Sequence, residues 1–484
     1  MTNVLLIILD SVRARNTSLH DYERQTTPFL ENFAERSTWY TQARAPGVGS
    51  IQSHTSIFTG LHVEQHRLRD SSKQLKRGRT IWEELAEHGY DTGVFSYNSY
   101  LTQAPIGLKD AFDVVESGDE QRLMFSDAYD PADLESDGVA RYIEFLRAAF
   151  ENDESIKSLG NGITHWEGLR PLLPDSLQGN SVAPDSTFTD SFLRWQEDSD
   201  GPWAACVNYM GAHSPYLPDE PHDKWAGKRD HEIMDSVEND TWSFISDNTE
   251  RSEREYLENL YDDCIHQVDV EVERLVTELE SRRILEDTFV VITSDHGEGF
   301  GEEGQVRPVR SIAHGNTGGP EEEVLHVPLL VFQPNQTEVS QVDRVASLTL
   351  FPDAVKKVLD GKGGEPLFVP ENGNVLASMF EFSSADRERL PEFVTEEDYT
   401  IYKHGSRVVY ETTDEGRIKK YVEWNGNRSA FDCTDVHSTV KFDWSGKHTV
   451  NEVYESLRRV DVLEGSTEEL SKEVEDRLEE LGYR

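Results

Sequence analysis

The sequence predicts an α/β fold, a three-layer sandwich around a mostly parallel central sheet, with a small C-terminal α+β subdomain. Short apolar runs rich in β-branched residues alternate with longer segments of helical periodicity, which is typical of strands covered by helices on both faces. The character of the chain changes after Phe382, where short strand-like segments are joined by turns. The 484 residues suffice for one large and one small domain.

Five apolar runs are predicted to form buried strands of the central sheet. The first reads VLLIIL and is followed directly by Asp10, and the run FVVIT leads into Ser294, Asp295 and His296. Continuous apolar runs suit strands that are buried on both faces. The predicted strands are residues 4–9, 92–95, 203–209, 289–293 and 327–332.

Helices are predicted between these strands from apolar residues at helical spacing. Thr27 suits the N-cap of the first helix, and Pro28 suits its first position because proline there loses no hydrogen bond. The longest periodic stripe includes Leu257 and Leu279. The predicted helices are residues 28–34, 80–87 and about 253–285.

The last hundred residues are predicted to form a separate unit, with a boundary near residue 385. The turn at Asn425-Gly426 indicates a hairpin, and a charged helix is predicted over 467–481. We expect a larger domain over 1–385, with a polar insertion at about 114–200, and a smaller one over 386–484. The predicted C-terminal strands are residues 401–402, 407–411 and 419–423.

The charge of the chain is strongly acidic and unevenly placed. There are 92 acidic and 47 basic residues, a formal net charge of -45, which argues against nucleic acid or an anionic membrane surface as a partner. Residues 1–110 are neutral, with 12 acids and 12 bases, so the excess lies in the rest of the chain. Many acids and only 15 lysines resemble proteins of salt-loving organisms, although an ordinary acidic surface has the same signature.

The cysteine content and the hydropathy predict a cytoplasmic protein that does not insert into a membrane. Cys206, Cys264 and Cys433 are far apart and form no CxxC pair, as expected in a reducing compartment. The N-terminal apolar run is too short for a signal sequence and has no basic segment before it. No run reaches the roughly 20 apolar residues that a membrane helix needs.

Two predicted strands each end in an aspartate, and this pair points to a metal. Ligands of open α/β sheets lie at the carboxyl ends of the strands. Asp10 and Asp295 brought together there would repel unless a cation or a proton intervenes, and His296 adds an imidazole. The alternative is that each aspartate only ends its strand and caps the next turn.

Ser50 begins a segment, SIQSHTSIFTG, that is predicted to be helical as far as Gly60. One interpretation is that Ser50 only caps this helix. The other is that Ser50 is a nucleophile, because a helix N-terminus and a nearby metal both stabilise an alkoxide. His54 follows one helical turn later and is the candidate for a substrate-binding side chain in the same pocket.

The order and spacing of several motifs resemble the sulfatase family of the alkaline phosphatase superfamily. These motifs are NVLLIILDSVR from Asn3, TTPFL from Thr26, the segment from Ser50 to Gly60, and TSDHGE from Thr293. The match continues through EVLHVPLLVF and LTLFPDAVKKVL and covers about 1–110 and 200–385.

The resemblance implies specific roles for site residues and one divalent metal ion. It implies that Asp10, Asp295 and His296 hold the metal together with the nucleophile Ser50. It implies that His213 contacts the ester or its leaving oxygen, and it places His314 in the region that supplies a further pocket residue. The alternative for both histidines is an ordinary loop position. The family's usual metal is Ca²⁺, and Zn²⁺, Mn²⁺ or Mg²⁺ stay open.

The sequence departs from the family at the nucleophile and in the sulfate pocket. The family motif places Pro and Arg after the nucleophile, where this chain has Gln52 and His54. Oxidation of Ser50 to formylglycine is therefore not expected. Ser11 replaces an acidic residue of the family, and FSYN, ending at Asn98, replaces an expected Gly-Lys-x-His motif. An unmodified hydroxyl resembles relatives that act on phosphate esters.

A basic stretch follows the Ser50 segment and is open to two interpretations. It is either a solvated loop or an attractive rim for an anionic ester. Its members are Arg67, Arg69, Lys73, Lys76, Arg77 and Arg79.

These observations favour a metal-dependent hydrolase of a small anionic ester, such as a sulfated or phosphorylated sugar, with Ser50, His213 and His314 as its catalytic residues. One alternative is a phosphoryl or substituted-phosphoryl transferase that acts on an anionic glycan or lipid precursor. Another is a non-catalytic scaffold that has kept the fold. The oligomeric state stays open.

Overall fold

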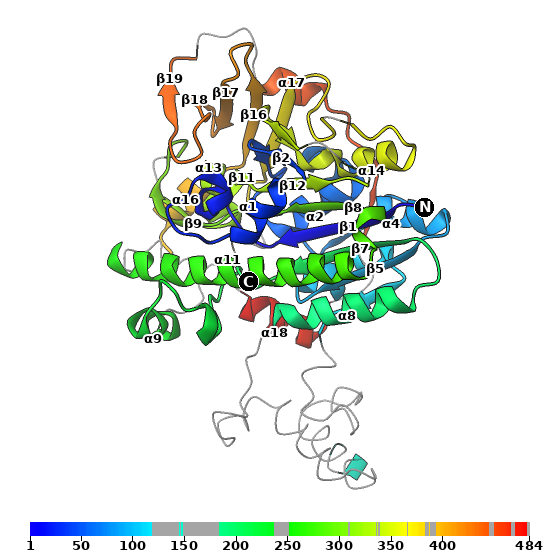
Figure 1. Ribbon diagram of the computed structural model, residues 1–484. Helices are drawn as coiled ribbons and strands as arrows, with labels where there is room; N and C mark the ends of the chain where they lie inside the picture. The colour runs from blue at the N-terminus through cyan, green and yellow to red at the C-terminus, as the bar shows by residue number, and fades with distance from the viewer. Residues whose placement is uncertain are drawn as a thin grey trace.

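The structure is a computed structural model, and most of the predicted insertion at 114–200 lies outside the residues that it describes. The described residues are 1–118, 145, 147–148, 183–236, 251–307, 310–334, 336, 339–364, 366–382, 387, 394–444, 450–465 and 470–481. The predicted α/β fold is confirmed: a large mixed sheet lies between two layers of helices (Figure 1).

The central sheet has eight strands in the order β13-β2-β12-β8-β1-β7-β5-β6. β1 (Asn3–Leu9) lies between β7 (Trp203–Tyr209) and β8 (Thr288–Thr293) and pairs with both in parallel. β5 (Asp91–Ser96) extends the parallel part beyond β7, and β12 (Leu329–Phe332) pairs antiparallel with β8. The outer strands are β2 (Thr38–Tyr40), β6 (Val114–Glu116) and β13 (Ser340–Val342).

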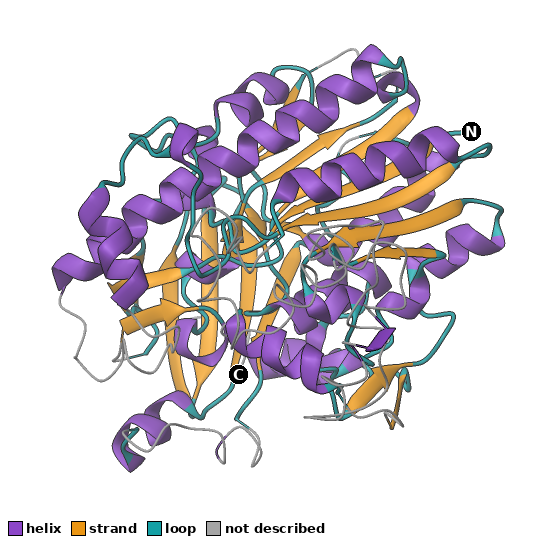
Figure 2. Ribbon diagram, turned by 90° about the horizontal axis from the view of Figure 1, so that it is seen from below, coloured by secondary structure: helices purple, strands orange, loops and turns teal. Residues whose placement is uncertain are grey.

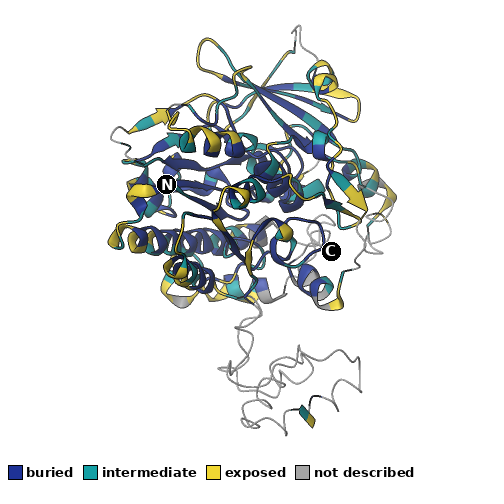
Figure 3. Cartoon of the chain, turned by 90° about the vertical axis from the view of Figure 1, so that its right-hand side faces the viewer, coloured by how far each residue is buried: buried dark blue, intermediate teal, exposed yellow. Residues whose placement is uncertain are grey.

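Helices cover both faces of the sheet because successive side chains of its central strands point to opposite sides. Leu5 and Ile7 of β1 pack in the core beneath α1 (Pro28–Ala34), α8 (Asp185–Asp198) and α11 (Arg251–Ser281). Leu6 and Ile8 pack in the other core. That core is covered by α2 (Ser50–Thr59), α4 (Ile81–Glu87) and α14 (Phe351–Leu359). The central strands of the sheet are buried, whereas exposed residues lie on the outer strand β6 and on the outer helices (Figure 3).

The first predicted helix is present, but a distant residue caps it. Thr27 makes no side-chain capping bond to α1; its hydroxyl accepts a hydrogen bond from Leu19 N instead. The carboxylate of Asp269, on α11, accepts hydrogen bonds from Phe29 N and Leu30 N at the start of α1. The helix N-terminus is therefore capped by a long-range contact that local sequence does not reveal.

A five-stranded antiparallel sheet forms the C-terminal part, with the strand order β15-β16-β17-β18-β19. Its hairpin at Asn425 and Gly426 has positive φ at both residues, as the Asn-Gly pair predicts. The predicted strand at Ile401-Tyr402 is wrong, because these residues end helix α16 (Glu396–Tyr402). The strands are β15 (Asn374–Met379), β16 (Ser406–Thr412), β17 (Ile418–Trp424), β18 (Asn427–Asp432) and β19 (Val440–Phe442).

The end of the chain returns to the large sheet. α18 (Lys472–Glu480) lies beside α8 in Figure 1, and its buried Arg477 donates hydrogen bonds to Tyr97 O at 2.8 Å and Ser117 O at 2.7 Å. A short strand, β20 (Leu463–Gly465), pairs with β4 (Lys73–Leu75). The division into domains at residue 385 stays a prediction.

Short elements complete the described chain (Figure 2). None of the helices in the described ranges is long and apolar enough to span a membrane. The short helices are α3 (Val63–His66), α5 (Ser99–Thr102), α9 (Lys228–Ser236), α12 (Gly315–Gly318), α13 (Glu322–Leu325) and α17 (Val450–Ser456). The short strands are β3 (Ala43–Arg44), β9 (Gly299–Glu303), β10 (Arg310–Ala313), β11 (His326–Val327) and β14 (Ala346–Ser347).

Candidate active site

Polar side chains gather where the four central parallel strands end. Asp10 follows β1, Asp295 follows β8 after one residue, Asn208 lies near the end of β7, and Asn98 follows β5 after one residue. β1 runs parallel to both of its neighbours, so the carboxyl ends of these strands lie together at one edge of the sheet. Ligands of open α/β sheets bind at this edge.

Asp10 is fully buried and held by two side-chain amides. Its Oδ2 accepts hydrogen bonds from Asn98 Nδ2 at 3.0 Å and from Asn208 Nδ2 at 3.2 Å. Burial raises the pKa of this carboxyl, but three nearby imidazoles and the hydrogen bond from Asn98 together lower it by more, so the net pKa lies below the ordinary value. The imidazoles are those of His213, His296 and His54.

One carboxylate oxygen of Asp295 accepts hydrogen bonds, and the other has no hydrogen-bond donor among the described residues. Its Oδ1 accepts hydrogen bonds from Ser11 N at 3.3 Å and His296 N at 3.0 Å, as the strand-end interpretation predicts. Its Oδ2 has no hydrogen-bond partner among the described residues, although it is buried. This oxygen lies 3.3 Å from His296 Nε2 and 3.5 Å from His54 Nδ1. A buried carboxylate oxygen in this state suits a cation.

Ser50 is the first residue of α2, and its hydroxyl faces His296. Gly49 takes the N-cap position of the helix. Its Oγ lies 3.3 Å from His296 Nε2. His296 Nδ1 donates to Gly297 O at 3.0 Å, which leaves the lone pair of a neutral ring on Nε2.

His54 lies one turn into α2 and has a fixed orientation. Asn208 Nδ2 donates to Asp10 Oδ2 and Ser96 Oγ, so Asn208 Oδ1 faces His54 Nε2 at 3.1 Å and accepts its proton. Nδ1 lies 2.9 Å from Ser50 O, a carbonyl that can only accept, so Nδ1 is the donor in that hydrogen bond. Nδ1 also lies 3.5 Å from Asp295 Oδ2 and is the nitrogen that could bind a metal if it gave up its hydrogen bond to Ser50 O, with Asn208 as the partner of Nε2.

His213 and His314 form the other wall of the site. The ring of His314 stacks on that of His296 with centroids 4.5 Å apart, and it lies 5.0 Å from the ring of His213. Burial lowers the pKa of His213 below its ordinary value. His314 differs, because its Nδ1 lies 3.3 Å from the buried carboxylate of Glu298.

Glu298 and His314 each favour the charged form of the other. Burial lowers the pKa of His314, but Glu298 raises it by more, so the net pKa lies above the ordinary value. Burial raises the pKa of Glu298, but His314 lowers it by more, so the net pKa of the carboxyl lies below the ordinary value. The pair therefore favours a protonated imidazole at the wall of the site.

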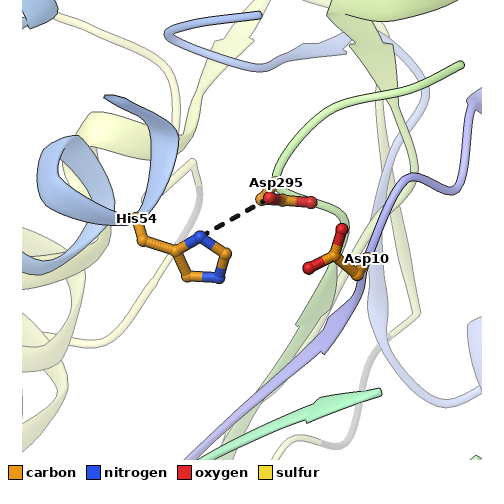
Figure 4. A group of neighbouring side chains, drawn as sticks. All are labelled: Asp10, His54 and Asp295. Carbon is orange, nitrogen blue, oxygen red and sulfur yellow. Dashed lines mark ion pairs between the residues drawn. The ribbon is translucent and has the colours of Figure 1, made fainter. Parts of the chain in front are cut away.

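The donor set at the strand ends fits a divalent metal ion. Asp10, His54 and Asp295 each offer one ligand atom, and these atoms lie within 4.8 Å of one another (Figure 4). All three side chains are buried, and Asp295 Oδ2 needs a cationic partner. Mixed carboxylate and imidazole ligands do not select one metal: carboxylates suit Mg²⁺, Ca²⁺ and Mn²⁺, and imidazoles suit Zn²⁺.

The seven residues proposed from the sequence as catalytic, metal-binding or substrate-binding lie at this edge, together with three side chains that were not predicted. His54 was predicted to bind substrate, whereas it lies close enough to Asp295 to act as a ligand. Asn208, Asn98 and Glu298 were not predicted as site residues. The signal for Asn208 was a polar residue within an apolar strand, and Asn98 and Glu298 lay inside motifs already compared with the family.

The sulfatase family profile matches residues 2–359. An arylsulfatase of Clostridium perfringens is 22% identical over 358 residues, which cover 69% of this chain and 68% of the relative. Iduronate 2-sulfatase of Mus musculus is 21% identical over 366 residues, which cover 69% of this chain and 60% of the relative. The chain thus spans about two thirds of the length of these relatives.

Solved structures share the fold. The phosphonate monoester hydrolase of Agrobacterium radiobacter superposes with a TM-score of 0.59 at 19% identity, covering 90% of this chain and 91% of that one. A 2-O GAG sulfatase superposes with a TM-score of 0.56 at 13% identity, covering 94% of this chain and 89% of that one. These two proteins therefore share their fold with this chain.

Proposed function

Because this chain belongs to the sulfatase family, we propose that it is a metal-dependent hydrolase of sulfate or phosphate esters with the unmodified Ser50 hydroxyl as nucleophile. One observation carries the proposal. The buried Ser50 Oγ lies at the N-terminus of α2, 3.3 Å from His296 Nε2, beside two aspartates at strand ends.

We assign Asp10, His54, Asp295 and His296, together with Ser50, to one divalent metal. When bound, the metal supplies charge that stabilises a serine alkoxide and the ester oxygens. The two amides on Asp10 Oδ2 orient that carboxylate, and Asn208 also fixes the ring of His54. These contacts hold the ligand atoms in place before an ion binds.

Ser50 releases its hydroxyl proton to solvent and attacks the phosphorus or sulfur atom in line; the bond from that atom to the ester oxygen breaks, and an alcohol leaves. The N-terminus of α2 stabilises the negative charge that forms on Oγ. We propose that His314 Nε2 delivers the proton to the leaving oxygen, since His314 Nδ1 is engaged with Glu298. Water then cleaves the covalent intermediate and regenerates the Ser50 hydroxyl. His213, which has a lowered pKa, contacts the ester as a neutral ring.

The proposed substrate is a small anionic ester, such as a sulfated or phosphorylated sugar. The family match supports a sulfate ester, and the fold shared with a phosphonate monoester hydrolase supports a phosphorus ester. His54 takes the place of the arginine that follows the nucleophile in the family motif. Formylglycine formation at Ser50 is not part of the proposal.

The test is turnover by Ser50→Ala on a panel of aryl sulfates, phosphates and phosphodiesters with several divalent ions. We expect Ser50→Ala to lose turnover while keeping its fold by circular dichroism. Ser53→Ala is the matched control, because Ser53 is a buried serine of the same helix whose Oγ has no hydrogen-bond partner in the described chain. Undiminished turnover by Ser50→Ala would refute the proposal.

The same experiment separates the two rival functions. A transferase would form a new ester when an alcohol or sugar acceptor is added, and product analysis would detect it. A non-catalytic scaffold would contain no metal and turn over none of the panel. A hydrolase releases the acid and the alcohol in equal amounts without an acceptor.

A further inference from the structure

The turn that carries His213 is held by a carboxylate from another element. β7 ends at Tyr209, and His213 follows after a short turn. Asp185, the first residue of α8, accepts hydrogen bonds from Met210 N at 2.9 Å on Oδ1 and from Gly211 N at 3.0 Å on Oδ2. Each carboxylate oxygen thus holds one of two successive backbone amides of this turn.

The position of the His213 ring depends on the backbone of the same turn. His213 N donates to Met210 O at 2.9 Å, and His213 Nδ1 donates to Ser214 O at 2.7 Å. These two bonds join the residue and its ring to the turn itself. A displacement of Met210 would therefore carry the ring with it.

The carboxylate approaches the turn too closely to leave room for a side chain at residue 211. A Cβ atom added to Gly211 would lie 2.4 Å from Asp185 Oδ2 and 2.9 Å from Val268 Cγ2, and both distances are shorter than van der Waals contact. Any side chain at this position would push away either the carboxylate or the turn. Gly211 and Asp185 are therefore matched to each other.

The helix that presents Asp185 is firmly anchored. The side chains of Phe188 and Phe192, on α8, are fully buried in the core beneath the central sheet. Thr189 Oγ1, also on α8, lies 2.7 Å from the hydroxyl of Tyr209, the last residue of β7. Asp185 itself is only 4% exposed. The carboxylate therefore has a fixed position relative to the end of β7.

The turn has room to move if the contact with the carboxylate is lost. A cavity of about 50 Å³ adjoins it, and the lining of this cavity includes Asp185, Met210, Gly211 and His213. An empty space beside a segment offers no atoms for packing contacts on that side. Hydrogen bonds to the carboxylate, rather than packing, therefore fix the turn on the side of the cavity.

We propose that Asp185 is a positioning residue of the candidate active site, which holds the turn after β7 so that His213 meets the ester. This inference rests on the proposed function, since it concerns how a residue of the same site is placed. Both oxygens of Asp185 are engaged by the turn, so Asp185 acts through His213 and not on the substrate.

The first test is amide hydrogen exchange in the full-length, metal-loaded protein, followed by mass spectrometry of the peptides that cover 203–213. Asp185→Asn keeps the shape of the side chain but replaces one acceptor by an amide group that only donates. We expect Met210 N and Gly211 N to exchange at least about tenfold faster in this variant, and β1 to exchange as in the parent. The pH is kept well above 7, because burial raises the pKa of Asp185 to about 7 and the carboxylate is the form under test.

The second test is a double-mutant cycle on kcat/KM with an aryl ester. Asp185→Asn is expected to lower kcat/KM at least about tenfold and to leave metal affinity unchanged, because the assigned metal ligands lie on other segments. In a His213→Ala background the same change is expected to have less than about a threefold effect, since the side chain that Asp185 positions is absent. Gly211→Ala, which displaces the carboxylate sterically, is expected to give the same pattern in both tests.

Asp190→Asn is the matched control, because it makes the same chemical change on α8 at a side chain that is 57% exposed. It is expected to leave the exchange rates and kcat/KM unchanged. If Asp185→Asn does not fold by circular dichroism, Gly211→Ala carries both tests.

Unchanged exchange at Met210 and Gly211 in the Asp185 variant would overturn the inference. So would equal losses of kcat/KM with and without the His213 side chain, or a parallel loss of metal affinity, because general damage to the site would produce either result. The outcome for Ser50→Ala is separate: retained turnover in that variant would refute the proposed nucleophile, and the exchange test would still decide whether Asp185 holds the turn.

Discussion

Replacing Glu298 by Gln should slow turnover of esters with poor leaving groups while keeping the shape of the side chain. In the structure the Glu298 carboxylate lies 3.3 Å from His314 Nδ1, and the two side chains are only 1% and 15% exposed. A hydrogen bond to a charged group contributes roughly 1.5–3 kcal/mol, which corresponds to about a 10- to 100-fold change in the population of protonated imidazole. We expect a loss of this size in kcat above neutral pH.

The pH dependence of kcat shows in which direction the Glu298→Gln change acts. His314 has a raised pKa, so it holds its proton up to a higher pH than an ordinary histidine and loses it as the pH rises through that value. Burial lowers the pKa of His314, and the Glu298 carboxylate opposes this effect, so the pKa falls when the carboxylate is removed. The basic limb of the kcat profile should then move to lower pH in Glu298→Gln.

A series of aryl esters with leaving groups of different acidity is the assay. Nitrophenyl esters need little protonation and should be affected least, and alkyl esters most. The variant should melt within a few degrees of the parent. An equal loss of kcat across the series, with an unmoved basic limb, would refute the role of the Glu298–His314 pair.

Three other predictions follow from the contacts around the site. Asn98→Ala and Asn208→Ala, which each remove an amide donor from Asp10, should weaken metal affinity about 10- to 100-fold, measured by titration of the metal-free protein; unchanged affinity would contradict their orienting role. Removing the metal with a chelator should abolish turnover and lower the unfolding free energy, by about 2.7 kcal/mol relative to protein held at a metal concentration a hundredfold above Kd; a melting curve insensitive to metal would contradict the site. Arg477→Met removes the hydrogen bonds that the buried guanidinium donates to Tyr97 O and Ser117 O and should cost about 2–4 kcal/mol in urea denaturation, whereas Arg194→Met on the surface should cost less than about 0.5 kcal/mol.

The sequence predicted the central sheet well because its strands are buried on both faces. The runs before Asp10 and after Thr288 are continuously apolar, and each became a strand with nearly the predicted bounds. The same reasoning failed at Ile401-Tyr402, a short apolar pair that ends a helix. Two residues carry too little periodicity to distinguish a strand from the last turn of a helix.

The site was predictable where a motif marks it and not where tertiary contacts assemble it. Asp10, Ser50 and Asp295 stand out because they end strands or begin a helix. Asn98 and Asn208 reach Asp10 from 88 and 198 residues away, and no local pattern shows that both amides meet one carboxylate. The orientation of His54 likewise depends on Asn208, on another strand. These contacts follow from strand order, which the sequence alone did not supply.

The most direct test of the central claim is to trap the covalent intermediate on Ser50. The protein would be mixed rapidly with a turned-over aryl ester, quenched in acid, digested and examined by mass spectrometry. The account predicts an unmodified serine in the resting protein and one sulfuryl or phosphoryl group on the peptide that contains Ser50 after mixing. Turnover with an adduct on another residue, or with Ser50 converted to formylglycine, would contradict it.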